Sequence, residues 1–306
     1  MLKTQTLIND FEKNLNQQAL SENTILNYVS NIENFLSWCD EQHKGMQIKN
    51  LNLHHLVYFR DHLVNYKRLK ASTINVIIQA LKKFFAFLHL KKIIKTNIAS
   101  SLKSIKKTKG MKPKALTKNE VHALLSKAGF STHGLGPRNY SIIKFLLNTG
   151  LRISELINLQ YRDLTLNKEL GEIRVVNSKG YKERTIQLNK NAKNTLSTYI
   201  KNNNLIPHPQ TPIFADNNKR YKTQTIQKMI STVAKRANIT RIKVSAHVLR
   251  HTFATHYLIN HPGGLIELST LLGHESINTT AIYTRMSSEH IRHTLEKLYK
   301  IDDTQI

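Results

Sequence analysis

Apolar residues in the first third of the chain recur at steps of three and four. Between Ser72 and Leu90 they mark one helical stripe, formed by Ile74, Ile77, Ile78, Leu81, Phe84, Phe85 and Leu88. Similar patterns predict amphipathic helices over residues 21–43 and 53–66. Residues 1–101 contain a single glycine and no proline that would interrupt such helices. This region is therefore predicted to form a small bundle of four or five helices.

The rest of the chain combines helical and strand-like patterns. Thr117 and Glu120 have the spacing of a capping box, which predicts that a helix begins there. Residues 172–177 (EIRVVN) and 183–188 (ERTIQL) flank a short polar turn, which predicts a β-hairpin. Further helices are predicted over residues 137–148, 190–202, 223–237, 246–259, 266–271, 276–284 and 288–300. The expected fold is mainly α with a small β-sheet: an N-terminal helical bundle followed by a mixed α/β domain.

Residues 102–116 (LKSIKKTKGMKPKAL) separate the two regions. They contain six lysines, one glycine and one proline, and neither an acidic residue nor an apolar period. We expect a basic linker between domains at 1–101 and 117–306, with a solvated connector as the alternative. The lysines that we expect to contact a phosphate backbone are Lys106, Lys107, Lys109, Lys112 and Lys114, together with Lys82 and Lys83, which leave the apolar stripe of their helix.

The charge of the chain points to a polyanionic partner. The formal net charge is +26, with +10 in residues 1–110 and +16 in residues 111–306, so both regions are basic. An AT-rich genome would explain many lysines but not the small number of carboxylates. Nucleic acid is the expected partner, and an anionic membrane surface is the rival.

The remaining composition favours the cytoplasm and argues against a membrane. No run of about 18 apolar residues is present, so no membrane-spanning helix is expected. The first residues lack the apolar core of a secretory signal. Cys39 is the only cysteine, which excludes an intrachain disulfide, and we expect it to pack beside Trp38 rather than to react.

Three short motifs carry candidate chemistry. The segment SAHVLRHTFATHYL places His247 and Arg250 at positions i and i+3, on one face if the segment is helical. The segment TGLRISEL has Arg152 and Glu155 at the same spacing, and LLGHESINTTAIYTRM contains His274 and, nine residues later, Tyr283. In this order the motifs resemble those of the tyrosine recombinases of the phage integrase family, close to the two-domain Xer-like members and to recombinases carried by transposons.

The residue types suit phosphodiester cleavage. Attack on a phosphodiester adds negative charge to its non-bridging oxygens, and the planar guanidiniums of Arg152 and Arg250 could stabilise that charge. The nucleophile would be Tyr283; an unperturbed tyrosine, with a pKa near 10, is a weak nucleophile at neutral pH and needs such neighbours. The alternative interpretation of either arginine, taken alone, is an ordinary surface residue.

Other polar residues would complete the site. Lys179, in the hairpin turn, matches the family's lysine that protonates the leaving 5′-oxygen, and Lys182 is its rival. His247 and His274 could donate hydrogen bonds to the phosphate or act as a base for Tyr283. Glu155 is expected to accept hydrogen bonds behind the site and to orient a cationic partner. A metal site at His247 and His251 is rejected, because no carboxylate or cysteine joins them and Arg250 would repel a cation; His251 is interpreted as structural.

The resemblance implies a mechanism and an assembly. A C-shaped clamp, with residues 1–101 as a SAM-like core-binding domain, would hold double-stranded DNA carrying paired inverted half-sites. Cleavage of one strand would give a 3′-phosphotyrosyl intermediate, followed by strand exchange and religation, without a metal ion or another cofactor. The assembly implied is a homo-tetramer closed through the C-terminal helix 288–300.

The motifs leave other functions open. A monomeric tyrosine-type topoisomerase and a catalytically inactive DNA-binding protein are the other functions considered. We expect no arm-binding domain before Ser21, which argues against the larger phage integrases. Resolution of dimers or cointegrates and integration of a mobile element stay open. The segment INHPGGLIEL has a proline and two glycines where the family usually has a shorter loop with one glycine, which affects the loop but none of the catalytic positions.

Overall fold

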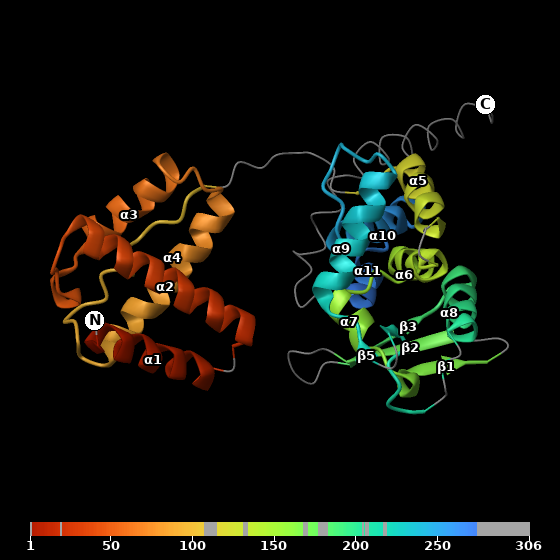
Figure 1. Ribbon diagram of the computed structural model, residues 1–306, viewed down its shortest axis with the longest axis horizontal. Helices are drawn as coiled ribbons and strands as arrows, with labels where there is room; N and C mark the ends of the chain where they lie inside the picture. The colour runs from red at the N-terminus through yellow and green to blue at the C-terminus, as the bar shows by residue number, and fades with distance from the viewer. Residues whose placement is uncertain are drawn as a thin grey trace, which may run out of the picture. The chain divides into compact units, whose positions relative to one another are not determined.

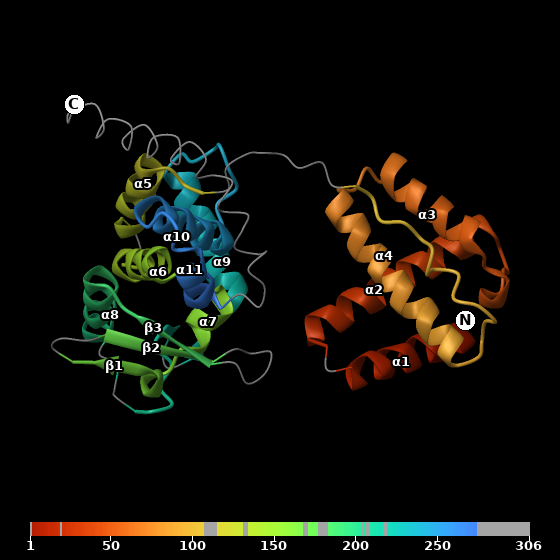
Figure 2. The same cartoon turned by 180° about the vertical axis from the view of Figure 1, so that it is seen from behind.

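The computed structural model describes residues 2–18, 20–106, 115–130, 134–167, 171–176, 183–203, 205, 208–216 and 219–273 (Figures 1 and 2). Contacts within the chain divide it into two compact units, Met1–Met111 and Lys112–Ile306. Each unit has its own hydrophobic core. The architecture is mainly α with small sheets in the second unit, as the sequence predicts.

The first unit is a helical bundle built around its last long helix. Its helices are α1 (Leu2–Gln17), α2 (Glu22–Gln42), α3 (Leu53–Asn65) and α4 (Ala71–Leu90), with a 3-10 turn at Ile48–Asn50. Helices α1, α2 and α3 all pack on α4. The predicted stripe of α4 is buried at all seven positions, and the ring of Phe84 meets that of Phe11 from α1 with centroids 5.1 Å apart. The helical pattern of this region is therefore confirmed.

Helix α4 is also the one helix of the described residues that is long and apolar enough to cross a membrane. Half of the relevant window is buried inside the first unit. Phe84 and Phe85 are fully buried there. The apolar character of α4 thus matches its place at the centre of a bundle core.

Both ends of the segment predicted as a linker are packed against a unit. Leu102 lies in the first core, and the side-chain amide of Asn75 pairs with Ile105, donating to its carbonyl (2.9 Å) and accepting from its N–H (2.8 Å). At the other end Leu116 lies in the second core and its N–H donates to Thr252 Oγ1 (2.9 Å). Lys106 is exposed beside this attached end. Outside the described residues lie Lys107, Lys109, Lys112 and Lys114.

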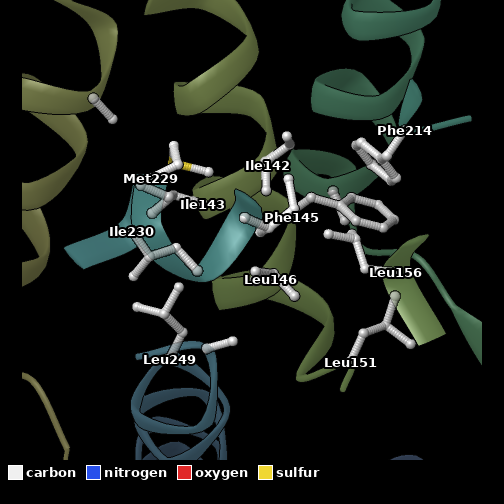
Figure 3. Close-up of a cluster of buried hydrophobic side chains, with 14 of the residues drawn as sticks. Ile142, Ile143, Phe145, Leu146, Leu151, Leu156, Phe214, Met229, Ile230 and Leu249 are labelled. Atoms are coloured by element: carbon white, nitrogen blue, oxygen red, sulfur yellow. The ribbon is translucent and has the colours of Figure 1, made fainter. Parts of the chain in front are cut away.

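In the second unit, one buried helix is surrounded by the other helices. Its helices are α5 (Lys118–Gly129), α6 (Gly136–Thr149), α7 (Ile153–Asn158), α8 (Lys190–Asn202), α9 (Thr223–Arg236), α10 (Ala246–Asn260) and α11 (Leu265–Leu272). Helix α6 is central, because its Ile143 and Leu146 face Ile230 of α9 and Leu249 of α10 (Figure 3). The predicted capping box at Thr117 and Glu120 is present at the start of α5.

A small antiparallel sheet lies beside α8 and below the helices in Figures 1 and 2. Its strands are β1 (Leu164–Leu166), β2 (Gly171–Val176) and β3 (Glu183–Gln187), in that order, and a separate pair is formed by β4 (Ala215–Asp216) and β5 (Lys219–Arg220). The predicted hairpin is the β2–β3 pair, in which Ile173 faces Ile186 and Val175 faces Arg184. Its turn, and the helices predicted over residues 276–284 and 288–300, lie outside the described residues.

Candidate active site

Two helix ends capped by glycine form the frame of the candidate site. Helix α6 ends at Gly150 (φ 63°) and α11 ends at Gly273 (φ 61°), both in the left-handed region that suits glycine. A Cβ on Gly150 would come within 2.9 Å of Leu272 Cδ2 and would also collide with Phe253. The two helix ends can therefore approach each other only because a side chain is missing at this position.

Arg152 and Glu155 follow directly after Gly150, at the start of α7. The carboxylate of Glu155 accepts from the backbone N–H of Arg152 (2.8 Å) and from its guanidinium, Nη1 to Oε1 (2.9 Å). An acidic side chain at the third position of a helix satisfies an N–H that has no partner inside the helix. The same local arrangement thus begins α7 and fixes the arginine beside the acid.

Glu155 holds three arginines from three different elements. Arg184 of β3 binds it with two parallel hydrogen bonds, Nη1 to Oε1 and Nη2 to Oε2, both 2.9 Å. Arg250 of α10 completes the group, with Nη1 at 3.9 Å from Oε2. Glu155 thus accepts hydrogen bonds from Arg152 and Arg184 and forms an ion pair with Arg250.

The same three arginines bind three consecutive carbonyls at the C-terminal end of α11. Arg184 Nε donates to Leu271 O (2.9 Å), Arg250 Nη2 to Leu272 O (2.6 Å) and Arg152 Nη2 to Gly273 O (3.3 Å). The last carbonyls of a helix have no acceptor role inside it and carry its partial negative charge. The arginines are therefore held between a carboxylate on one side and a helix end on the other. We call Arg152, Glu155, Arg184 and Arg250, with these carbonyls, the arginine cluster.

The arginine cluster keeps its acid ionised although the acid is buried. Burial alone would raise the pKa of Glu155, but the hydrogen bonds and charge of Arg184, and then the contacts with Arg152, outweigh it and hold the pKa below its usual range. Three guanidiniums then face one carboxylate. Among the described residues, the cluster carries a formal excess of two positive charges, which suits a phosphate that gains negative charge during a reaction.

The two arginines of the sequence motifs differ in their access to solvent. The side chain of Arg152 is 38% exposed, whereas that of Arg250 is 4% exposed. Arg250 also donates from Nη1 to Gly150 O (2.8 Å), so it joins the C-terminal ends of α6 and α11. Arg152 is thus the more accessible of the two to a ligand from solvent, and Arg250 in addition connects the two helix ends.

His247 and Arg250 both lie on α10, as the sequence predicts. Nε2 of His247 is 2.9 Å from Nε2 of His251, and His251 is buried. The two rings are thus within hydrogen-bond distance, and their tautomers decide which nitrogen donates and which accepts. In the described part of the chain, no group of three or more His, Cys, Asp and Glu side chains could hold a metal ion.

Comparison with known proteins identifies the family. Residues 114–290 match the profile of the phage integrase family, and residues 8–92 match that of the phage integrase N-terminal SAM-like domain. The chain belongs to the phage integrase family. It is a tyrosine recombinase of the Xer type, an enzyme of site-specific DNA recombination.

Two curated relatives and one solved structure show how far the likeness extends. The recombinase is 33% identical over 283 residues to tyrosine recombinase XerD of Haemophilus ducreyi, covering 90% of this chain and 91% of the relative. It is 32% identical over 285 residues to tyrosine recombinase XerC of Bacillus licheniformis, covering 91% and 90%. Its fold resembles that of the XerH site-specific recombinase bound to palindromic difH substrate, with a TM-score of 0.73, 23% identity and coverage of 89% of this chain and 78% of that one.

The structure brings together part of the predicted site of the recombinase. Arg152, Glu155 and Arg250 meet in the arginine cluster, and His247 lies one turn before Arg250 on α10. The other predicted residues, Lys179, His274 and Tyr283, and the rival Lys182, lie outside the described residues. In the sequence, His274 directly follows Gly273, whose carbonyl belongs to the arginine cluster, and Tyr283 follows ten residues after Gly273.

Sequence reasoning missed Arg184. In this hairpin, only Lys179 and Lys182 were considered as candidates from the sequence. The alternation of side chains along β3 could have revealed Arg184. Residues two apart on a strand share a face, so Arg184 lies on the same face as Ile186, which is buried. An arginine on the buried face of a strand needs an anionic partner, and Glu155 is that partner.

Proposed function

We propose that the recombinase cleaves one DNA strand with the hydroxyl of Tyr283. The tyrosine oxygen attacks the phosphorus, a 3′-phosphotyrosyl ester forms, and the bond to the 5′-oxygen breaks. After strand exchange, the free 5′-hydroxyl of another strand attacks the ester and releases the tyrosine. The observation that carries this proposal is the arginine cluster, a preformed cationic site whose Gly273 lies ten residues before Tyr283 in the sequence.

Each predicted residue has a place in this reaction. The guanidiniums of Arg152 and Arg250 stabilise the charge that builds on the non-bridging oxygens. His247 and His274 donate hydrogen bonds to the same phosphate, or accept the proton of Tyr283. Lys179 protonates the leaving 5′-oxygen. The cycle uses no metal ion and no nucleotide, because the phosphotyrosyl ester conserves the energy of the broken bond.

The partner we propose is double-stranded DNA with paired inverted half-sites, on which four protomers assemble. The excess of 26 positive charges supports a DNA partner. Solved structures of similar fold include XerH on palindromic difH and a lambda integrase dimer bound to a core site. We further propose that the C-terminal helix 288–300 joins neighbouring protomers, and that the enzyme works in the cytoplasm, where it would meet chromosomal DNA.

The nucleophile is tested with Tyr283→Phe on a nicked suicide substrate, from which the cleaved product diffuses away. The variant should bind DNA with unchanged affinity but give no protein–DNA adduct that survives denaturation. Tyr66→Phe, which removes a hydroxyl from a side chain that is 77% exposed in the first unit, is the matched control and should form the adduct normally. A denaturation-resistant adduct from Tyr283→Phe would assign the nucleophile to another residue.

The biological reaction is tested with plasmids that carry one or two copies of the selected DNA site. We propose resolution of dimers or cointegrates, or integration of a mobile element, and both reactions need two sites. Deletion or inversion between two sites supports a recombinase. Relaxation of a supercoiled plasmid with one site, without exchange between two, supports the topoisomerase alternative, and binding without any adduct supports an inactive DNA-binding protein.

A further inference from the structure

We propose that Arg184 is a positioning residue for DNA cleavage: it fastens the hairpin strand β3 to Glu155 and to the end of α11, and thereby sets the places of Arg152 and Arg250. This inference rests on the proposed cleavage reaction. Arg184 would act through its neighbours rather than by touching DNA.

The contacts of Arg184 use its guanidinium in three directions. Two donors grip both oxygens of Glu155, and the third, Nε, donates to Leu271 O. The parallel fork is a geometry that only arginine offers to a carboxylate. The side chain of Arg184 is 11% exposed and that of Glu155 is 4% exposed, so the pair is largely shielded from water. Three of the five donors of Arg184 are thus used on protein acceptors.

The surroundings of Arg184 leave little freedom. Gly273 covers it, because a Cβ there would lie 2.8 Å from Arg184 Nη1 and 3.1 Å from Cδ. On the strand it follows the hairpin turn and precedes the buried Ile186. A single side chain thus joins the hairpin, the start of α7 and the end of α11. The hairpin turn holds Lys179, and the chain beyond α11 holds His274, so Arg184 links the supports of both predicted groups.

Arg184 and Arg152 share the same acid. Oε1 of Glu155 accepts from Nη1 of both arginines, and Oε2 accepts from Arg184 Nη2 and from the backbone N–H of Arg152. If Arg184 is lost, the charged groups of the described residues that still face Glu155 are Arg152, from the start of α7, and Arg250, from α10. Arg152 is then drawn towards an acid that it previously shared, and the acid protonates more easily because its strongest partner has gone.

The test compares Arg184→Gln, Arg184→Lys and the matched control Arg174→Gln. Arg174 lies on the neighbouring strand β2 and also pairs with carboxylates, but with Asp163 and Glu183 instead of Glu155. The cleavage rate constant is measured in single turnover on the suicide substrate, with protein in excess, from pH 6 to 9. Affinity for the half-site and the thermal unfolding midpoint are measured on the same preparations.

For Arg184→Gln we expect a rate constant lower by roughly 10- to 100-fold, as when an outer partner of a reactive site is lost, with half-site affinity within about threefold. The loss should be greater towards the acidic end of this range, because the pKa of Glu155 rises when the hydrogen bonds and charge of Arg184 are removed. Arg184→Lys keeps the charge but not the fork, so it should restore the flatter pH profile and only part of the rate. Arg174→Gln should behave as wild type.

A rate constant for Arg184→Gln equal to that of the Arg174→Gln control overturns the proposal. So does a loss that is the same at every pH and is not relieved by lysine, since that would indicate a purely structural role. If Arg184→Gln does not fold, Arg184→Lys decides: a wild-type rate overturns the proposal and a lowered rate at normal affinity supports it. The wild-type enzyme separates the two hypotheses, because its failure to form any adduct would contradict the proposed function instead.

Discussion

Among the single side chains, Glu155 is an acid that stays ionised with only 4% of its side chain exposed. Removing a carboxylate from water costs several kcal/mol, and attraction to a single cation in good geometry often only balances that cost. Glu155 receives four hydrogen bonds, two on each oxygen, from Arg152 and Arg184. The cost of burial is therefore offset by several charged donors, and loss of the acid would leave three arginines without their common anion.

We predict that Glu155→Gln lowers the free energy of unfolding by about 3–5 kcal/mol at pH 7, the range for breaking a buried ion pair. The pKa of Glu155 is depressed in the folded state, so its contribution is complete above its unfolded pKa, near 4.3. That contribution is lost as the pH falls from there through the folded pKa. The difference in the free energy of unfolding between wild type and variant should hence be constant from pH 8 to 5 and become smaller below about pH 4.

Urea unfolding at pH 7, 5 and 3.5 measures this dependence. Asp216→Asn, which removes an exposed carboxylate at β4, is the control and should change stability by less than about 0.5 kcal/mol at all three values. A Glu155→Gln difference that grows on acidification would show that the acid is protonated in the native state.

The sequence identified some members of the arginine cluster and not others, for a physical reason. Arg152, Glu155 and Arg250 lie in motifs whose spacing and order resemble the family, so they could be named without a structure. Arg184 has no such spacing to its partner, which is 29 positions away and on another element. The contacts of the three arginines with Leu271, Leu272 and Gly273 involve backbone carbonyls, which no side-chain pattern reveals.

At the level of elements, prediction succeeded where burial follows a regular period. The stripe of α4 and the helices α8, α9 and α10 lie within two residues of their predicted bounds. Helix α7 was not predicted, because its six residues are too few to show a period and its start depends on the contact of Glu155 with Arg152. Strands β4 and β5 have two residues each and show no alternation that could be recognised.

The end of α11 gives a prediction at this level. Gly273→Ala should destabilise the protein by about 1–2 kcal/mol through its left-handed backbone alone, and further through the approach of Cβ to Arg184. Cleavage should fall as well, because Arg184 must move away from Leu271 or Glu155. The control is Gly263→Ala, which has φ of 94° but open space around a Cβ.

Thermal unfolding and single-turnover cleavage of the two variants provide the comparison. Gly263→Ala should show the backbone strain alone, with cleavage near that of wild type. Equal destabilisation and equal cleavage in both variants would mean that the Arg184 side chain can move away from a Cβ at position 273 without loss of stability or activity. The packing of Gly273 on Arg184 would then have no effect on the site.

At the level of the whole molecule, positive charge is spread over both units. Residues 102–116 concentrate six lysines, and Lys106 is exposed where the first unit ends its packing. Replacing Lys106, Lys107 and Lys109 by Gln should reduce the slope of log affinity against log salt by up to about 0.9 for each lysine that contacts a phosphate. The preferred DNA sequence should not change, since contacts with phosphates carry no direct sequence information.

Salt titrations of DNA binding measure this slope. Lys13, Lys44 and Lys49, exposed lysines of the first unit, changed together to Gln, form a control that removes the same charge. An equal reduction in both triple variants would mean that only the net charge matters. A changed sequence preference would show that the lysines of the linker read bases or groove shape.

The last prediction concerns assembly on DNA. In the helix predicted over residues 288–300, Ile291, Leu295 and Leu298 share one stripe, and a helix of this length is marginal without a partner surface. If each protomer gives this helix to the next, a cyclic exchange closes the tetramer. Deletion of residues 288–306 should then preserve folding and half-site affinity, while assembly on a full site and recombination fall more than about tenfold. Native gels with half and full sites measure both. A truncated protein that aggregates or unfolds as a monomer would place the helix in its own core, and docking on a neighbour would be refuted.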